Sequence, residues 1–255
     1  MKDMFKLDGK VIAVVGGAGG IGKACSMALS AHGATVVLAS RNEDNLMKAA
    51  KEINAETGVE TGFIQVDTSD EASVNQLADD VVAKYGKVDV LVNTQGMNIK
   101  GLITDFSAED WDRIFEVNVK GVMLCCKAFG KKMMEAKTGK IINMSSVRGI
   151  RGTGGGNTAY GATKGAVDMI TRMLAAEFAP YGINVNAMAP SLVLTDTIKK
   201  AVAPERLEML ASSSLFKRLG TPEEMAGTCV FLASDAANFI TGQILYIDGG
   251  LTAVG

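Results

Sequence analysis

The chain has 255 residues, with 26 Lys and Arg against 28 Asp and Glu, and a formal net charge of −2. Because α/β folds often reach about 250 residues as one unit, this length predicts one domain over residues 1–255. The near balance of charge gives no general attraction to nucleic acid or to a membrane surface, so neither is an expected partner. The first ten residues lack the apolar centre of a secretory signal, and no run approaches the roughly 20 apolar residues of a spanning helix. We therefore expect a cytoplasmic protein.

Histidine is the scarcest residue, since His32 is the only one in the chain. His32 precedes Gly33 at the end of a helical pattern, where a polar side chain suits a helix C-terminus. A hydrolytic triad and a His-rich metal site therefore have no other candidate imidazole. The four cysteines form no Cys-x-x-Cys pair, and we interpret them as small core or surface thiols. We expect no metal site, and chemistry that depends on hydroxyls, amines, carboxylates or a bound cofactor.

Seven short apolar runs rich in β-branched residues predict strands buried on both faces of a parallel sheet. They lie at residues 11–15, 35–40, 62–67, 88–94, 140–145, 183–189 and 243–248. Helical patterns fall between them, at residues 21–31, 43–55, 71–85, 108–134, 159–179 and 222–234. Ser107 and Thr221 are typical of helix N-termini. The alternation predicts an α/β fold: a single-domain, doubly wound, Rossmann-like parallel sheet of about seven strands with helices on both faces.

The segment at residues 190–221 interrupts this alternation. It is mostly polar, with one short helical pattern at residues 205–211, and it follows the carboxyl end of a predicted strand. Open α/β sheets place ligands at that edge, so we interpret the segment as a substrate lid within the domain. The alternative is an ordinary surface loop.

A glycine-rich stretch lies between the first predicted strand and the first predicted helix. Glycines there let the backbone approach a pyrophosphate, and the helix N-terminus offers unpaired N–H groups and a positive dipole end. The spacing Gly16-x-x-x-Gly20-x-Gly22 differs from the G-x-G-x-x-G of the commonest dinucleotide folds. It is not a Walker loop, because Ala24 follows Gly22-Lys23. The position of the stretch predicts a dinucleotide site.

The second predicted strand ends at Ser40-Arg41, where a site that prefers NAD usually carries Asp or Glu. No carboxylate stands here to repel a phosphate, and a guanidinium can bind phosphate through two parallel hydrogen bonds. The pair therefore favours NADP as the cofactor, with NAD still open. The alternative is a solvated loop arginine opposite Glu43 or Asp44.

Tyr160 and Lys164 lie four residues apart on a predicted helix, which places the phenol and the ammonium on one face. A free tyrosine titrates at about pH 10, so its phenolate needs a nearby cation near neutral pH. Ser146 follows the end of a predicted strand, where its hydroxyl can hydrogen-bond a substrate carbonyl and position it against the phenol. The three residues together predict a site that handles a carbonyl group.

With two further features, these motifs resemble the short-chain dehydrogenase/reductase family over almost the whole chain. The features are Asn118 within Glu-Val-Asn-Val at 116–119 and the Asp-Gly-Gly sequence at 248–250. Gluconate 5-dehydrogenase-like members are the nearest in pattern. The resemblance implies an NAD(P)-dependent oxidoreductase that interconverts a secondary alcohol and a ketone by hydride transfer.

The resemblance also implies roles for single residues. Tyr160 would be the general acid/base, and Ser146, rather than Ser145, would polarise the substrate carbonyl. Lys164 would lower the pKa of Tyr160 and hold the nicotinamide ribose, and Asn118 would order a water in the proton relay behind Lys164. The residues implied to border the cofactor are Gly16, Gly19, Gly20, Ile21, Gly22, Ser40, Arg41, Asp67, Thr68, Asn93, Gly96, Tyr160, Lys164, Pro190, Val193 and Thr195.

Four positions depart from the family pattern. Val15 stands where Thr is usual, which removes a hydroxyl that would tie the first strand to residues 93–96. Thr94 and Gln95 replace Asn and Ala, and we expect the tie to be rebuilt, with Gln95 as the candidate. Ser191 replaces a Gly beside the nicotinamide. None of these changes removes a catalytic role.

The substrate is less well marked than the reaction. Polar and basic residues gather near the expected pocket, namely Asn98, Lys100, Arg148 and Arg151. A guanidinium suits carboxylates, so Arg148, with Ser146 and Tyr160, is a candidate substrate contact. We therefore hypothesise a small polar substrate such as a sugar acid, a polyol or a hydroxy or keto acid. The alternative is that these charges are solvated loop residues.

Other functions remain open at this point. A 3-oxoacyl-carrier-protein reductase and a hydroxysteroid dehydrogenase use the same catalytic residues, and a non-catalytic nucleotide-binding protein would keep the fold. The resemblance also implies a homo-oligomer, a tetramer or dimer, formed through the long predicted helices around 108–134 and 159–179 and through the C-terminal strand.

Overall fold

Seven parallel strands form the centre of the protein, whose computed structural model describes residues 3–254. The strands are β1 (Val11–Val15), β2 (Thr35–Ser40), β3 (Gly62–Gln65), β4 (Val90–Asn93), β5 (Gly139–Met144), β6 (Ile183–Pro190) and β7 (Ile244–Ile247). They stand in the order β3-β2-β1-β4-β5-β6-β7, and each neighbouring pair is parallel. This arrangement confirms the predicted doubly wound α/β sheet.

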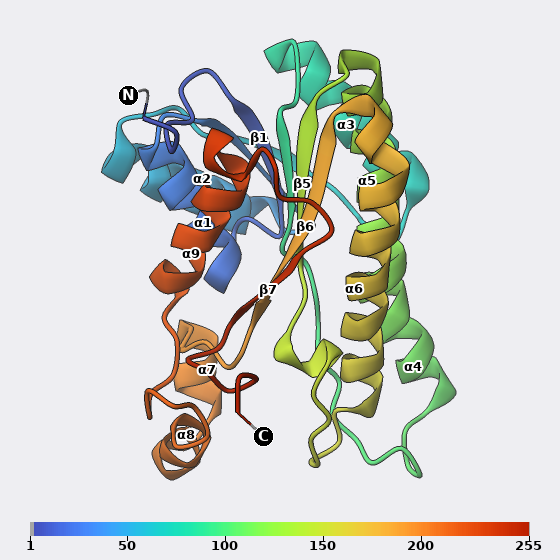
Figure 1. The fold of residues 1–255 in the computed structure, drawn as a ribbon, viewed down its shortest axis with the longest axis vertical. Coiled ribbons are helices and arrows are strands. Elements are labelled where there is room, and N and C mark those ends of the chain that lie inside the picture. Colours follow the sequence, from blue (N-terminus) through green and yellow to red (C-terminus); the bar gives the residue numbers. More distant parts are fainter. Residues whose placement is uncertain (1–2, 255) are drawn as a thin grey trace.

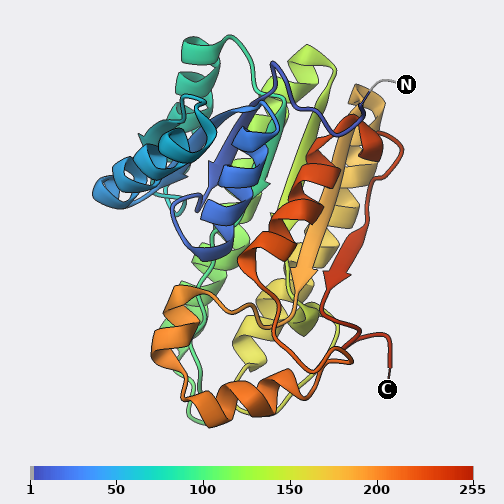
Figure 2. The same ribbon diagram turned by 90° about the vertical axis from the view of Figure 1, so that its left-hand side faces the viewer.

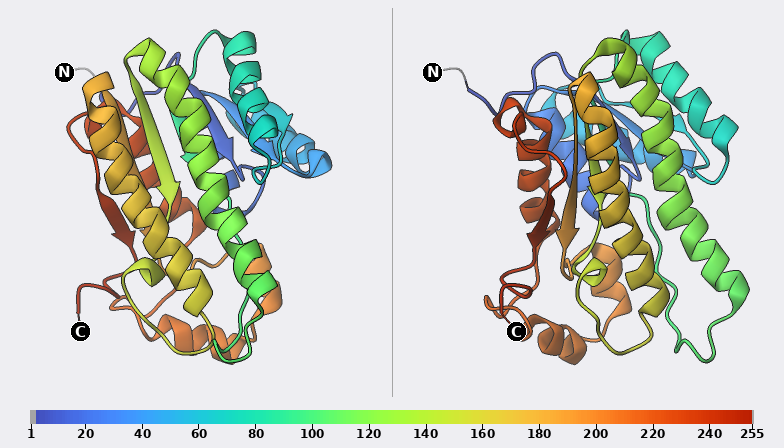
Figure 3. Two further views of the ribbon diagram at one scale, coloured as in Figure 1. Left: turned by 90° about the vertical axis from the view of Figure 1, so that its right-hand side faces the viewer. Right: turned by 45° about the vertical axis from the view of Figure 1, so that its right-hand side comes forward.

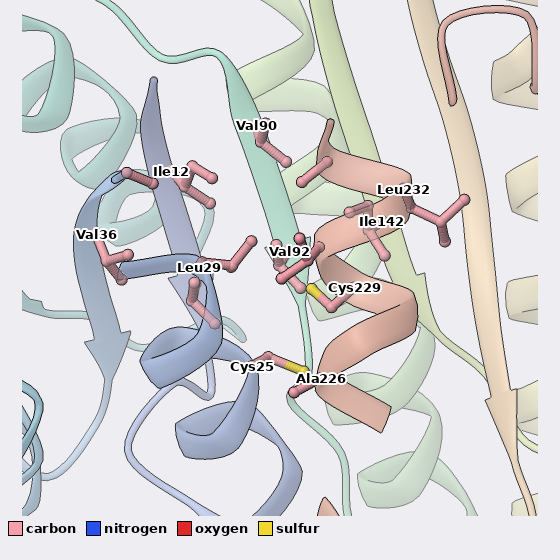
Figure 4. Close-up of a cluster of buried hydrophobic side chains, with 14 of the residues drawn as sticks. Ile12, Cys25, Leu29, Val36, Val90, Val92, Ile142, Ala226, Cys229 and Leu232 are labelled. Carbon is pink, nitrogen blue, oxygen red and sulfur yellow. The ribbon is translucent and has the colours of Figure 1, made fainter. Parts of the chain in front are cut away.

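Helices cover both faces of the sheet (Figure 1). One face carries α1 (Gly20–Ala31), α2 (Glu43–Thr57) and α9 (Pro222–Ala233), and the other carries α3 (Glu71–Tyr85), α5 (Gly121–Ala136) and α6 (Thr158–Phe178). Successive side chains of a strand point to opposite faces, so in β1 Ile12 and Ala13 belong to different apolar clusters. Figure 4 shows the first cluster, where Cys25 of α1 and Cys229 of α9 lie fully buried over the sheet. Burial on both faces holds the strands between two helical layers, because each large apolar side chain that is buried stabilises the fold by roughly 1.5–3 kcal/mol.

The helix ends follow the predicted signals. The Ser107 hydroxyl accepts a hydrogen bond from the Asp110 N–H at 3.0 Å, and Thr221 forms a capping box with Glu224. His32 is the C-cap of α1, and its Nδ1 lies 2.8 Å from the Ala28 carbonyl oxygen. The structural interpretation of His32 is therefore confirmed.

The helix predicted as one element at residues 108–134 is interrupted. The structure has α4 (Ala108–Phe115), then a π-helical turn η1 (Glu116–Lys120), then α5. A π turn holds one more residue than an α turn, and such turns are frequent at functional sites. The sequence pattern could not show it, because the turn is stabilised by contacts of Asn118 outside the helix. Figure 3 shows α5 and α6 lying side by side beyond this turn.

The segment at residues 190–221 lies over the carboxyl ends of the strands (Figure 2). It contains two helices, α7 (Asp196–Ala201) and α8 (Pro204–Ala211), where the sequence predicted one. Its two ends meet, since Val193 pairs with Gly220 and the Leu194 N–H donates to the Gly220 carbonyl at 2.8 Å. The segment therefore starts and closes beside the edge of the sheet where a ligand would bind.

Three further properties bear on function. All four cysteines are free and buried, so none is a surface thiol. Within residues 3–254, no group of three or more His, Cys, Asp and Glu side chains is arranged to hold a metal ion. No helix in the same range has the length and apolar character needed to cross a membrane.

Candidate functional site

The glycine turn after β1 is shaped by close backbone approach. Gly16 has a φ of +81°, and a Cβ there would lie 2.8 Å from the Gln95 nitrogen. A Cβ at Gly22 would overlap the Gly16 carbonyl oxygen. Helix α1 then begins at Gly20, and its cap residue Gly19 has no side chain to accept from the first N–H groups. Those N–H groups are therefore free of a side-chain cap and suited to phosphate oxygens.

A cavity of about 280 Å³ lies beside this turn, at the ends of β1, β2 and β3. Six of the predicted cofactor residues line it: Gly16, Ser40, Arg41, Asp67, Thr68 and Gly96. Hydrogen bonds from Ser69 hold the pKa of Asp67 below its ordinary value, and the charge of Arg41 acts in the same direction. Arg113 and Glu116, which the sequence did not single out, also line the cavity. They lie far along the chain from the glycine turn, so only the fold brings them here.

A second cavity of about 280 Å³ continues along the carboxyl edge of the sheet. It is lined by eight predicted residues: Ile21, Gly96, Ser146, Tyr160, Lys164, Pro190, Val193 and Thr195. Gly20 and Thr195 also border a larger groove, of about 790 Å³, between α1, α7 and α9. Gly96 is shared by both smaller cavities, so they form the two ends of one candidate cleft.

Ser146 and Tyr160 meet at the wall of the second cavity. Ser146 acts to lower the pKa of Tyr160, and its Oγ donates to the Pro190 carbonyl at 3.4 Å and accepts from the Arg148 N–H at 3.2 Å. Ser145 points elsewhere, with its Oγ 3.4 Å from the Lys164 carbonyl oxygen. The geometry therefore agrees with the choice of Ser146 over Ser145.

Lys164 lies beneath Tyr160 in a buried environment. Its Nζ donates to the Met144 carbonyl at 2.7 Å and lies 5.5 Å from the centroid of the Tyr160 ring. Burial lowers the pKa of Lys164 to about 8. Burial also raises the pKa of Tyr160, against the effects of Ser146 and Arg148. Burial therefore outweighs Ser146 and Arg148 in setting the direction of the Tyr160 pKa, and the expected lowering of that pKa by Lys164 stays a prediction.

Asn118 supports the cleft from the π turn. Its Oδ1 accepts from the Met97 N–H at 2.8 Å, and its Nδ2 donates to the Met97 carbonyl at 2.9 Å and to Thr163 Oγ1 at 3.1 Å. A Cβ at Gly96 would lie 3.4 Å from Asn118 Oδ1 and 3.5 Å from Lys164 Nζ. Both N–H directions of the amide are thus used within the protein, while Oδ1 accepts one bond next to the lysine.

Comparison with known proteins places the whole site within one matched family region. A family model described as enoyl-(acyl carrier protein) reductase matches residues 16–252. A 3-oxoacyl-[acyl-carrier-protein] reductase from Thermotoga maritima is 38% identical over 248 residues, which cover 97% of this chain and 99% of that protein. The chain belongs to the short-chain dehydrogenase/reductase family. It is an oxidoreductase, as the resemblance implied.

Other members of the short-chain dehydrogenase/reductase family are similar at the same level. A D-threitol dehydrogenase from Mycolicibacterium smegmatis is 38% identical, covering 97% of this chain and 95% of that protein. A solved structure of a gluconate 5-dehydrogenase from Burkholderia cenocepacia, in complex with NADP and tartrate, superposes with a TM-score of 0.94. It is 33% identical and covers 99% of each chain.

The departures from the family pattern are compensated inside the chain. The tie that Val15 cannot make is rebuilt by Thr94, whose hydroxyl donates to the Val15 carbonyl at 2.8 Å. The expectation that Gln95 would rebuild it is wrong, because Gln95 Nε2 turns away to Cys125 Sγ at 3.8 Å. Asn93 is fully buried and donates to Asn143 Oδ1 at 2.9 Å. Its side chain therefore supports the floor of the cleft from below.

The polar residues proposed near the substrate separate in space. Asn98 lines the second cavity and donates to Asn157 Oδ1 at 3.2 Å. Arg151 instead binds the Leu251 carbonyl near the C-terminus. The described residues that line this cavity do not include Lys100, Arg148 or Arg151. Arg148 still acts on the site through its charge, which lowers the pKa of Tyr160.

Proposed function

We propose that this enzyme interconverts a secondary alcohol and a ketone with a nicotinamide dinucleotide, using Tyr160 as the general acid/base. The observation that carries the proposal is that Ser146, Tyr160 and Lys164 line one cavity, where Ser146 acts to lower the pKa of the Tyr160 phenol. The site has a proton donor, a carbonyl-polarising hydroxyl and a cation in one cavity. These are the groups that carbonyl reduction needs.

Each residue has a step that its position allows. In reduction, negative charge develops on the carbonyl oxygen, Ser146 donates a hydrogen bond to it, and Tyr160 gives it a proton. In oxidation, Tyr160 takes the alcohol proton, which requires the phenolate. The raised pKa of Tyr160 keeps the phenol protonated near neutral pH, the form that reduction uses. The cofactor supplies or accepts the hydride when it is bound.

The residues present fit such a cofactor. A Cβ at Gly16 would clash with the Gln95 nitrogen and one at Gly22 with the Gly16 carbonyl, so both glycines are needed for the tight turn. A Cβ at Gly19 would meet nothing within 4 Å, so the turn leaves room there for a pyrophosphate. Gly16, Gly19, Gly20, Ile21 and Gly22 would hold the phosphates, and Lys164 the nicotinamide ribose. Ser40 and Arg41 at the adenosine end favour NADP over NAD.

The proposed substrate is a small polar alcohol or ketone, such as a polyol or a sugar acid. Support comes from the polar side chains of Asn98 and Ser191 on the cavity wall. It also comes from relatives named D-threitol dehydrogenase and galactitol 2-dehydrogenase. A 3-oxoacyl-carrier-protein reductase is the second candidate, favoured by exposed apolar side chains at Leu102, Ile103 and Phe216 on nearby loops.

The decisive experiment is a substrate panel followed at 340 nm with both cofactors. We expect turnover of polyols or sugar acids, and loss of at least about a thousandfold in kcat in Tyr160→Phe, because the ring stays while the proton is lost. Cofactor binding by the same variant should be retained, which separates lost chemistry from lost folding. Turnover confined to bulky apolar alcohols would contradict the substrate proposal, and unchanged kcat in Tyr160→Phe would contradict the mechanism.

We also propose a homo-oligomer, a tetramer or a dimer, and a cytoplasmic location. Met123 on α5 and Met169 and Met173 on α6 are exposed on the two helices that lie side by side (Figure 3). Met169 and Met173 lie four residues apart and so share one face of α6, and exposed apolar side chains on one face are typical of an interface between subunits. Four free thiols agree with a reducing compartment. Sedimentation velocity measures the oligomeric state directly.

A further inference from the structure

A buried carboxylate, Asp168, lies one helical turn beyond Lys164 on the inward face of α6. Asp168 is 4% exposed, and its Oδ1 is buried without a hydrogen-bond partner among residues 3–254. A buried polar atom left unpaired costs free energy, so its presence calls for a reason. The mechanism above gives Asp168 no part.

The carboxylate is enclosed by the segments that carry the catalytic groups. The Ser145 hydroxyl lies 3.4 Å from the Lys164 carbonyl oxygen, and Ser145 acts to lower the pKa of Asp168. A Cβ at Gly149 would lie 2.6 Å from Asp168 Oδ2 and 3.1 Å from the Lys164 carbonyl. The carboxylate therefore sits between the end of β5, the turn after Ser146 and the helical turn of Lys164.

The charged and titratable groups facing this pair come from several elements. They are Lys164 and Arg172 of α6, Tyr246 of β7, Asp248 after β7, and Tyr160 and Arg148 near the ammonium. Burial lowers the pKa of Lys164, and the charge of Asp168 opposes that shift. Burial raises the pKa of Asp168, and Ser145, Arg172 and Lys164 oppose it. The buried lysine and the buried carboxylate thus stabilise each other's charged forms.

We propose that Asp168 is a positioning residue of the active site, which keeps the Lys164 ammonium ionised and, through Ser145, fixes the strand end that carries Ser146. Ser145 and Ser146 are neighbours in the chain, and Ser145 acts on the pKa of Asp168 while Ser146 acts on that of Tyr160. Holding the first therefore sets the position of the second. The inference rests on the proposed function, because both effects act through Ser146, Tyr160 and Lys164.

The test compares loss of the Asp168 charge with loss of the Ser145 hydroxyl. Asp168→Asn removes the charge and keeps a group that can bond Ser145. We expect the alkaline limb of the kcat/KM profile to move to lower pH by about one unit, because an unsupported ammonium loses its proton earlier. The pH dependence of NADPH binding, followed by fluorescence, should move the same way. Ser145→Ala removes only the hydroxyl beside Asp168, and should lower kcat/KM roughly tenfold with the alkaline limb in place.

A matched control separates positioning from general stability. Asp89 is a partly buried carboxylate at the opposite end of the sheet, where it accepts from the Val11 N–H at 2.7 Å. Asp89→Asn should lower the melting temperature without moving the alkaline limb. If Asp168→Asn does not fold, Asp168→Ser removes the same charge without added volume and is read in the same way.

Two results would overturn the proposal. One is an alkaline limb and a binding profile that stay in place when the charge of Asp168 is removed. The other is a shift of the alkaline limb in Ser145→Ala as large as in Asp168→Asn, which would mean that the charge of Asp168 has no effect of its own. The absence of any wild-type turnover would count against the proposed function instead, and the binding profile, which needs no substrate, would still judge Asp168.

Discussion

Arg41 is the exposed side chain on which the proposed preference for NADP depends. It follows β2 directly, lines the adenosine end of the cleft and lowers the pKa of Asp67 through its charge. The Gln65 side chain donates to the Arg41 carbonyl at 2.7 Å, which holds the backbone of the residue. The guanidinium is therefore attached to a fixed backbone while its head stays exposed to a ligand.

Substitution of Arg41 by Ala should change the preference between the two cofactors. A 2′-phosphate loses its charge-assisted hydrogen bonds, so we expect the NADPH Kd to rise about tenfold or more while the NADH Kd changes little. Fluorescence titration with both cofactors measures the two constants. Arg113→Ala is the matched control, since Arg113 lines the same cavity from α4. Equal weakening of both cofactors in Arg41→Ala would show that Arg41 does not read the phosphate.

Among the helices and strands, the π turn η1 supports the site through Asn118. It widens the helix between α4 and α5 at Asn118, and so brings the amide to the backbone of Met97. Met97 follows Gly96, where the two cavities join, and Thr163 precedes Lys164. One irregular turn therefore connects the loop after β4 with the helix that carries Tyr160 and Lys164.

Asn118→Ala should weaken both folding and catalysis. The variant leaves the N–H and the carbonyl of Met97 without their partners, so we expect the free energy of unfolding to fall by about 2 kcal/mol. We also expect a lower kcat, because the loop beside Lys164 loses its attachment. Urea unfolding and steady-state rates measure the two effects. Lys120→Ala, in the same turn but in an exposed ion pair with Glu116, should change stability by less than about 0.5 kcal/mol. Equal effects of the two variants would contradict this role of Asn118.

Across the whole molecule, the order of strands and helices could be predicted because each element carries its own local pattern. The glycine turn and the Tyr160-Lys164 pair could be predicted for the same reason, since their spacing is short. The role of Thr94 and the position of Arg148 could not, because each depends on which strands become neighbours. The π turn and the burial of Asp168, whose Oδ1 has no hydrogen-bond partner among residues 3–254, depend likewise on packing between distant segments. Local spacing thus shows the reaction, and tertiary contacts decide how its groups are held.

The two ends of the sheet also differ in what their buried charges do. At the carboxyl end, Lys164 is buried within the proposed active site. At the amino end, Lys140 of β5 is 7% exposed beside a polar cavity of about 260 Å³. Its Nζ has no hydrogen-bond partner within residues 3–254, and burial lowers its pKa to about 8. A buried amine outside the active site reduces stability without serving the proposed reaction.

The effect of Lys140 on stability has a definite sign. An unfolded lysine titrates at about 10.4, so the folded chain binds fewer protons than the unfolded chain between about pH 8 and pH 10.4. Stability therefore rises with pH across this window, and below it the full cost of a buried ammonium is present. Lys140→Met should raise the free energy of unfolding at about pH 7 by roughly 1–2 kcal/mol and flatten the rise toward about pH 10. A smaller rise should persist, because the pKa of Lys164 is lowered in the same way.

Urea unfolding at several pH values tests this expectation, with Lys10→Met as the control. Lys10 borders the same cavity but lies 4.0 Å from Asp89 and is about a third exposed, so its replacement should give no gain. The charge of Asp235 favours the ammonium of Lys140 and opposes the effect of burial. A loss of stability in Lys140→Met would mean that this attraction exceeds the cost of burial, and that Lys140 joins β5 to the turn after α9.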